Sequence, residues 1–439
     1  MEFKQAHRLE NLHVSGTRVV FGKCSELAAQ GIPVTALTLG QPDFDTPQYI
    51  IDACKKALDE GKTRYTDGSG IQELKEAVCQ KLEKENGLHY TPSEISVTTG
   101  VAQGMFVALL STLNPGDEVL VPDPVYLTYS EIPNIAGAII KKYDLLEEND
   151  YQVDVDQIRS LITDKTKMII PVHIGGYPVD MDPIMALAKQ HDIVVLEDAA
   201  HAFGGEYKHR KLGTIGDFGS FSFHEVKNIT SFGEGGILCS NVTEFLPEMR
   251  RARFLGTDFS KHIPNWLYDV TAIRGKNGPF VATNFSTTEI QGLGLQLQIA
   301  RIDQIIEARR RASEYLTKRL SACDALIPQD LGNDEIKPTF HLYQLQIIPE
   351  KAGGDIQLFK KKMDAKGVTQ IPHFGPLYKF EILREYGYDE KAIAESCPVC
   401  EEVFNHRFTH FPIYGLTPEQ LDYMADAILE SVDEMQRGV

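Results

Sequence analysis

Short apolar runs alternate with amphipathic stretches between residues 95 and 240, and this alternation is the clearest pattern in the chain. The runs that are short and apolar enough for buried strands are residues 95–98, 118–121, 167–172, 193–196 and 218–223. Apolar residues at helical spacing lie between them, at 105–113 and 181–191. Strands that alternate with helices predict a mainly parallel, doubly wound α/β sheet.

Longer helical patterns flank this region on both sides. Residues 47–60 and 71–86 have apolar positions at helical spacing, and so does the long stretch 288–322. The apolar face of the long stretch consists of Ile290, Leu293, Leu297, Ile302, Ile305 and Ile306. We expect one strongly helical segment there, and we interpret the run Arg309, Arg310 and Arg311 as its solvated face.

The pattern changes after residue 326 to short strands and helices, at 341–348, 357–366, 368–372 and 421–435. We therefore expect an N-terminal arm at 1–40, a large domain at 41–300 and a small carboxyl-terminal α/β domain at 301–439. Residues 250–283 are irregular and predict a surface loop near the mouth of a site.

Composition and charge narrow the class of protein. The 439 residues suffice for two domains, and the formal net charge of −18 argues against a nucleic-acid partner. No apolar run is long enough to span a membrane, and residues 1–8 are too polar for a secretory signal. Seven scattered cysteines suggest reduced thiols. We expect a soluble cytoplasmic protein that does not act on membranes.

Cys397 and Cys400 form a C-x-x-C pair, which is one half of a typical zinc site. No second C-x-x-C or close histidine pair completes such a site in the sequence. We interpret both cysteines as small, half-buried residues beside a turn, and we expect no metal.

Two of the predicted strands end in residues with catalytic potential. Residues 193–196 lead into Glu197 and Asp198, and residues 218–223 lead into His224 and then Lys227. An aspartate alone is usually a helix cap, and a lysine alone is usually a solvated surface residue. Together, in this order, they suit pyridoxal 5'-phosphate (PLP). The carboxylate keeps the pyridine nitrogen protonated, and the lysine forms a Schiff base with the aldehyde.

A phosphate site is suggested by the strand at 95–98. It ends at Gly100, directly before a helix, where unpaired backbone N–H groups and the helix dipole favour an anion. Glycine before a helix is common, so this pattern becomes informative only with Asp198 and Lys227 downstream.

The carboxyl-terminal part, residues 165–439, resembles the sugar (sugar-nucleotide) aminotransferases among the fold-type I PLP enzymes. The matching motifs are PVHIGGYPVDMDPI (171–184), EDAAHAFGGEYK (197–208), GSFSFHEVKNITSFGEGG (219–236) and TNFSTTEIQGLGLQLQIARID (283–303). The resemblance implies a three-layer fold-type I transferase, with PLP as cofactor, in which Lys227 is both the covalent anchor and the general acid/base.

The same resemblance implies roles for further residues. Ser222 is expected to bind the phosphate together with the backbone N–H groups of Val101 and Ala102. His201 is expected near the phenolic oxygen of the cofactor ring, although a buried histidine satisfied by backbone is the alternative. Asn284 matches an asparagine that reaches the phosphate of the partner subunit.

The opening part, residues 37–130, resembles a different branch, the class I amino-acid aminotransferases. The resemblance rests on GQPD at 40–43 and YTDGSG at 65–70. It places Gly40 at the substrate and Tyr65 across the subunit boundary, so that a homodimer shares its active sites. Tyr126 is expected to stack on the pyridine ring, with core filling as the alternative.

The two resemblances leave the amino acceptor open. The sugar family has Asn-Tyr-Arg-Met where this chain has Asn284-Phe285-Ser286-Thr287, so an expected arginine is missing. No motif marks the arginine that clamps a carboxylate in the amino-acid family; Arg407 and, more weakly, Arg274 are candidates. We expect transfer from glutamate or glutamine to a keto-sugar or related carbonyl compound, with an α-keto acid as the alternative acceptor. A PLP lyase or dehydratase is disfavoured because related dehydratases replace the lysine with histidine.

Overall fold

The computed structural model describes residues 30, 46–62, 69–123, 129, 132–133, 136–146, 151–254, 256, 273–275, 278–280, 285–368, 379 and 389–438. These residues divide into two compact units. The sheet unit holds the described residues of Pro42–Arg310 and Leu331–His341, and the carboxyl-terminal unit holds those of Met1–Gln41, Arg311–Asp330 and Leu342–Val439. The domain limits expected from the sequence, at 40 and 300, stay predictions.

The main sheet of the described residues has seven strands in the order β1-β9-β8-β5-β4-β2-β3. β9 is antiparallel to both of its neighbours, and the other adjacent pairs are parallel. The strands are β1 (Ile95–Thr98), β2 (Glu118–Asp123), β3 (Ile139–Asp144), β4 (Thr166–Ile169), β5 (Val194–Asp198), β8 (Phe218–Ser222) and β9 (Gly236–Ser240).

The three neighbouring strands β1, β9 and β8 are covered on both faces. All residues of β1, β8 and β9 are buried, although successive side chains of a strand point to opposite faces. Continuous apolar runs of this kind are typical of a parallel sheet between two helical layers. The predicted three-layer, mainly parallel α/β fold is therefore confirmed.

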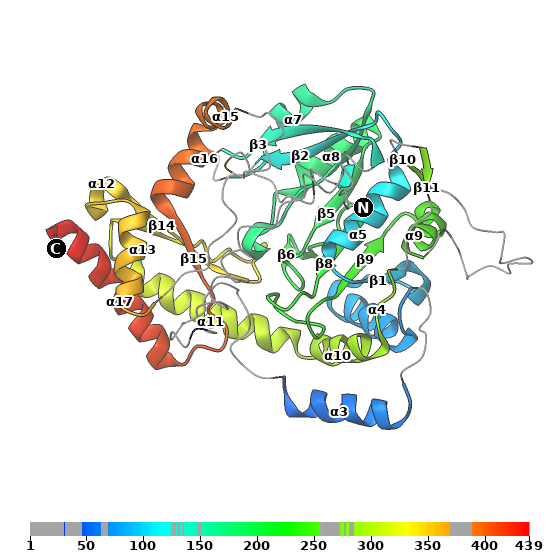
Figure 1. Cartoon of the computed structure of the whole chain (residues 1–439), viewed down its shortest axis with the longest axis horizontal. Coiled ribbons are helices and arrows are strands. Elements are labelled where there is room, and N and C mark those ends of the chain that lie inside the picture. The colour runs from blue at the N-terminus through cyan, green and yellow to red at the C-terminus, as the bar shows by residue number, and fades with distance from the viewer. Residues whose placement is uncertain are drawn as a thin grey trace, which may run out of the picture. The chain divides into compact units, whose positions relative to one another are not determined.

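The helices of the sheet unit pack on this sheet and on one another (Figure 1). α5 lies against β8 and β9, and α10 packs against α4 and α3. The helices are α3 (Gln48–Asp59), α4 (Gln72–Asn86), α5 (Val101–Thr112), α7 (Val155–Leu161), α8 (Met181–His191), α9 (Leu246–Arg253) and α10 (Glu289–Ile299).

The helix expected at 288–322 is two helices, α10 and α11 (Ile302–Leu320). The break is visible in the hydrogen bonds, because the N–H of Arg301 donates to the C=O of Gln298, three residues back. Buried residues such as Ile299, Ile302 and Ile305 continue across the break. Apolar periodicity alone therefore could not reveal it.

The interpretation of Arg309 as part of a solvated face is wrong. Arg309 is 7% exposed, and its Nη1 donates to the C=O of His341 at 2.8 Å. Arg309 lies four residues after Ile305 and three before Ala312, both buried, so it falls on the apolar face of α11. Arg310 forms an ion pair with Glu307 at 2.8 Å and is partly exposed.

Smaller strands extend the sheet unit. β13 (Ile336–Lys337), β6 (Glu206–Tyr207) and β7 (Arg210–Lys211) form a small antiparallel sheet. β10 (Ile273–Gly275) and β11 (Gly278–Phe280) form a hairpin inside the segment expected to be irregular.

The carboxyl-terminal unit is a small α/β layer structure. Its antiparallel sheet has the order β12-β14-β15, with β12 (Leu326–Pro328), β14 (Tyr343–Ile347) and β15 (Phe408–Phe411). α12 and α13 pack on α17. The helices are α12 (Pro349–Ala352), α13 (Ile356–Ala365), α15 (Glu390–Ser396), α16 (Pro398–Glu402) and α17 (Pro418–Arg437). Among the described residues, no helix combines the length and the apolar character needed to cross a bilayer.

Candidate active site

The strand ends that carry the predicted site residues meet at one edge of the main sheet. β1, β8 and β5 run in the same direction, so Thr98, Ser222 and Asp198 lie at their carboxyl ends. Across the strands, Gly236 of β9 pairs with both Thr98 and Ser222, and Asp198 pairs with Ser220. Three separate segments therefore contribute to one edge, which is where sheets of this type bind ligands.

Asp198 and Lys227 interact electrostatically at this edge. Asp198 is 5% exposed, and its Oδ1 accepts the N–H of Ala200 at 2.8 Å. Burial raises the pKa of Asp198 to about 6, although the Ala200 N–H and the charge of Lys227 both lower it. Burial likewise lowers the pKa of Lys227 to about 8, against the attraction of Asp198. Desolvation therefore moves both groups toward their neutral forms.

Lys227 is placed by a turn directly after β8. Its backbone N–H donates to the C=O of His224 at 2.9 Å, and the N–H of His224 reaches the Oγ of Ser222 at 3.4 Å. Ser222 and Lys227, which the sequence predicts to act together, thus belong to one short hydrogen-bonded segment.

The sequence predicts an anion-binding site at Gly100 and the N-terminus of α5. Gly100 precedes the first residue of α5 with φ 141° and ψ 167°, a backbone conformation that favours glycine. A Cβ on Gly236 would lie 2.6 Å from the carbonyl carbon of Gly100, so β9 and the turn approach closely. The helix begins at Val101, four residues earlier than the sequence predicts. Its first N–H groups, including those of Val101 and Ala102, have no intrahelical acceptor, as in any helix.

His201 follows β5 and is half-buried. Its Nδ1 accepts the N–H of Gly175 at 3.2 Å, so the proton of the neutral ring is assigned to Nε2. The ring stacks on that of His341, with the centroids 4.4 Å apart and the planes at 27°. Sequence reasoning missed His341 because no motif marks the segment that carries it.

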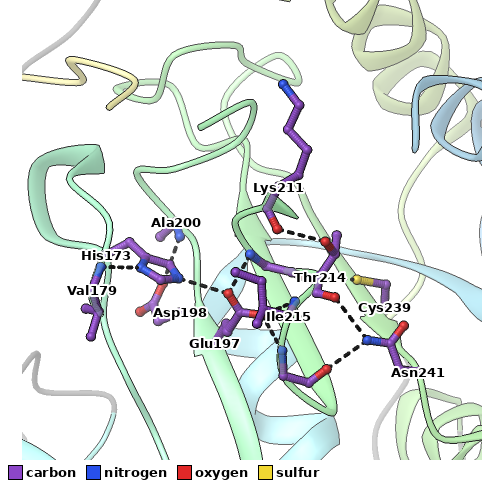
Figure 2. Close-up of polar contacts among 12 residues, drawn as sticks. His173, Val179, Glu197, Asp198, Ala200, Lys211, Thr214, Ile215, Cys239 and Asn241 are labelled. Carbon is purple, nitrogen blue, oxygen red and sulfur yellow. Dashed lines mark hydrogen bonds and ion pairs between the residues drawn. The ribbon is translucent and has the colours of Figure 1, made fainter. Parts of the chain in front are cut away.

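Glu197, the neighbour of Asp198, is fully buried and holds a second polar network (Figure 2). Its Oε1 accepts the N–H groups of Ile215 and Gly216 at 2.5 and 2.6 Å. Its Oε2 accepts the N–H of Gly213 at 2.8 Å and lies 3.0 Å from Nε2 of His173. A buried carboxylate is stabilised by several donors of this kind.

His173 connects this network to the backbone of Asp198. Its Nδ1 accepts the N–H of Val179 at 3.1 Å, so Nε2 carries the proton and donates to Glu197 (Figure 2). The backbone N–H of His173 donates to the C=O of Asp198 at 3.1 Å. The strand end that presents Asp198 is therefore held by a backbone hydrogen bond from the segment that carries His173. In the sequence, the indication of this buried network is the charged residue Glu197, which directly follows the apolar run 193–196.

Several predicted residues lie outside the described residues, namely Gly40, Tyr65, Tyr126 and Asn284. The backbone of Arg274 belongs to β10, but its side chain is not described. Arg407 is half-buried in the carboxyl-terminal unit, in the helical turn Val403–Arg407. The roles of all six residues stay predictions.

Cys397 and Cys400 are both half-buried, as the sequence predicts. Within the described ranges, no group of three or more His, Cys, Asp or Glu side chains is arranged to hold a metal ion.

The described residues fit PLP. They supply a buried acid and a half-buried lysine that interact, a glycine-lined turn at a helix N-terminus, and a serine at the adjacent strand end. These are the groups needed for the pyridine nitrogen, the aldehyde and the phosphate of the cofactor.

Comparison with known proteins agrees with this chemistry. The model of the DegT/DnrJ/EryC1/StrS aminotransferase family matches residues 46–429. A relative from Aquifex aeolicus named "Probable aspartate/prephenate aminotransferase" is 29% identical over 389 residues, which cover 84% of this chain and 90% of that protein. The GDP-perosamine synthase of Caulobacter vibrioides is 32% identical over 298 residues, 65% of this chain and 73% of that protein. The chain spans about half the length of some other aspartate aminotransferases that it matches.

Solved structures support the fold. DesV of S. venezuelae, solved in complex with a ketimine intermediate, superposes with a TM-score of 0.72 and 21% identity. The superposition covers 96% of this chain and 98% of DesV. From the family match over most of its length, the chain belongs to the DegT/DnrJ/EryC1/StrS aminotransferase family and is an aminotransferase that uses PLP.

Proposed function

We propose that this aminotransferase moves an amino group from glutamate or glutamine to a keto-sugar or a related carbonyl compound, with Lys227 as the covalent anchor. The observation that carries the site assignment is the electrostatic interaction of buried Asp198, at the end of β5, with half-buried Lys227, in the turn after β8. When bound there, PLP supplies an electron sink that lets a proton leave the substrate carbon.

The residues of this chain have distinct tasks in the proposal. Asp198 holds a proton at the pyridine nitrogen, because a buried carboxylate that accepts one backbone N–H among the described residues can also bind a protonated nitrogen. Lys227 carries a proton between two carbons, and its lowered pKa makes the neutral amine accessible near neutral pH. Ser222 and the N–H groups after Gly100 bind the phosphate, and His201 donates from Nε2 to the phenolic oxygen.

The preference for a sugar acceptor rests on the family and on the carboxyl-terminal motifs. GDP-perosamine synthase, a relative of this chain, carries a sugar nucleotide in its name. Aspartate and prephenate aminotransferases are also relatives, so an α-keto acid is the second candidate acceptor.

We further propose a cytoplasmic homodimer in which Tyr65 and Asn284 reach the phosphate of the partner subunit. The expectation follows from the motifs that contain these residues and from the scattered cysteines. Light scattering combined with gel filtration tests the assembly. If an enzyme bearing Lys227→Ala is mixed with one bearing Asn284→Ala, a shared site predicts partial recovery of activity.

A two-step assay tests the substrate. Glutamate or glutamine should remove the visible absorbance of the lysine-bound cofactor and leave the pyridoxamine form. Keto-sugars, sugar nucleotides and α-keto acids are then tested separately for their ability to restore the band. Restoration by a sugar ketone, but not by keto acids other than that of the donor, supports the proposal. Efficient restoration by many keto acids, abolished in Arg407→Ala, would favour the amino-acid class.

A further inference from the structure

His341 is a buried histidine at the end of the segment 331–341. This segment belongs to the sheet unit, whereas the residues on both sides of it belong to the carboxyl-terminal unit. The side chain of His341 contacts that of Asn228, which is 113 residues away in sequence and directly follows Lys227. A residue from a distant segment therefore lies beside the proposed anchor.

The backbone around His341 is held firmly. The N–H of His341 donates to the C=O of Gly175 at 3.1 Å, and its C=O accepts Nη1 of Arg309 at 2.8 Å. Phe340, which is 2% exposed, has φ +50°, a left-handed conformation that bulky residues rarely adopt. Such a strained conformation persists where the surrounding structure holds it. The position of the His341 ring is thus determined by contacts on several sides.

Two contacts connect this ring to the proposed cofactor site. Nδ1 of His341 lies 2.9 Å from Oδ1 of Asn228, so Nδ1 is assigned the proton and donates. The face of the ring stacks on His201 at 4.4 Å. One side chain therefore contacts both the residue after Lys227 and the residue proposed to bind the phenolic oxygen.

We propose that His341 is a positioning residue that couples Lys227 and His201. Through Nδ1 it fixes Asn228 and hence the turn that presents Lys227. Through its ring it fixes the plane of His201, whose Nδ1 is already engaged by Gly175, so that Nε2–H points consistently at one acceptor. The inference rests on the proposed roles of Lys227 and His201.

Two substitutions separate the two contacts. His341→Phe retains a ring that can stack on His201 but lacks Nδ1. His341→Asn retains an N–H near the position of Nδ1 but has no ring. His191→Phe, at an exposed histidine on α8, is the matched control for loss of a histidine.

Each substitution has its own readout. In His341→Phe, we expect the pH titration of the absorbance of the lysine-bound cofactor to move its midpoint by about half a pH unit or more, because this absorbance depends on the surroundings of Lys227. In His341→Asn, we expect the dissociation constant for the cofactor to rise about tenfold, because His201 loses its support. ¹⁵N NMR of selectively labelled histidines in the cofactor-free Asn variant should show mixed tautomers of His201, because an unstacked ring tilts away from the Gly175 N–H that fixes its tautomer.

The result that would overturn the proposal is a lower melting temperature in both variants with titration midpoint, cofactor affinity and His201 tautomer all as in His191→Phe. His341 would then be a core residue only. Failure of the proposed function looks different, because the wild type would show no visible absorbance or Lys227→Ala would retain it.

Discussion

Glu197 and Asp198 are adjacent buried carboxylates of β5, and their side chains point to opposite faces of the strand. The two carboxylates differ in the hydrogen-bond donors that surround them. The carboxylate of Glu197 accepts hydrogen bonds from the backbone N–H groups of Gly213, Ile215 and Gly216 and from Nε2 of His173. Among the described residues, the Asp198 carboxylate accepts the N–H of Ala200. The first charge is surrounded by donors and stabilises a turn. The second is left with a raised pKa and is suited to bind a proton on another molecule.

The largest expected effect comes from removing the lysine that Asp198 faces. Lys227→Ala should abolish the visible absorbance and lower kcat by at least about 10⁴-fold, because covalent anchor and proton carrier are lost together. Absorbance spectra and steady-state kinetics measure both quantities. Lys189→Ala, at an exposed lysine on α8, should behave like the wild type. Normal turnover in Lys227→Ala contradicts the site assignment.

Asp198→Asn tests the catalytic side of the comparison. The amide can still accept the Ala200 N–H, but it cannot hold a proton at the pyridine nitrogen. We expect kcat to fall on the order of 10²–10³-fold while the cofactor content changes little. Kinetics together with the amount of bound cofactor per subunit decide this. An equal loss of binding and rate would make Asp198 a structural residue.

Glu197→Gln tests the structural side. The new amide group points an N–H toward donors that need an acceptor, and we expect a loss of about 2–4 kcal/mol in the free energy of unfolding. Denaturant unfolding of the cofactor-free protein measures it, with Gln190→Glu on the exposed surface of α8 as a control. A variant as stable as the wild type would show that the donors around Glu197 are satisfied by other groups.

The smallest effect that we expect is on the pH dependence of the free energy of unfolding, and it comes from the raised pKa of Asp198. The pKa of Asp198 is about 6 in the folded protein against an ordinary 3.8, so between these values the folded protein binds more protons there than the unfolded chain. Stability from this group is therefore lost as the pH rises through about 6. Cofactor-free Asp198→Asn lacks this loss and should be more stable than the wild type above pH 6, by up to about 3 kcal/mol. A constant difference between pH 4 and pH 8 contradicts this expectation.

The sequence was sufficient to locate Asp198, Ser222 and Lys227 because each lies at or just after the end of a short apolar strand, and parallel strands bring their carboxyl ends to one edge. The same logic could not find His341, whose neighbourhood depends on a chain reversal that leaves no periodic pattern. The prediction of a solvated Arg309 is wrong because it relies on the charge of the residue and not on its helical spacing from buried apolar residues. Arg309 occupies the apolar face of α11 between Ile305 and Ala312, and its Nη1 donates to a backbone carbonyl that only the folded chain brings within reach.

The role of Glu197 is only partly predictable from the sequence. Glu197 stands next to Asp198 in the same motif, and nothing in a linear pattern says which carboxylate faces the ligand. Alternation along a strand requires that they face opposite sides, but the choice depends on the location of the 213–216 turn. That location is a property of the tertiary fold.

The passage of the chain between the two units has a consequence for dissecting the protein. The chain leaves the sheet unit after Arg310, returns at Leu331 and leaves again after His341. A gene fragment that stops before Leu331 would encode Lys227, Asp198 and His201 but neither β13 nor the histidine that stacks on His201. Expressing the sheet unit alone would therefore require a fusion that joins residue 310 to residue 331. Simple truncation should yield a fragment that binds the cofactor poorly.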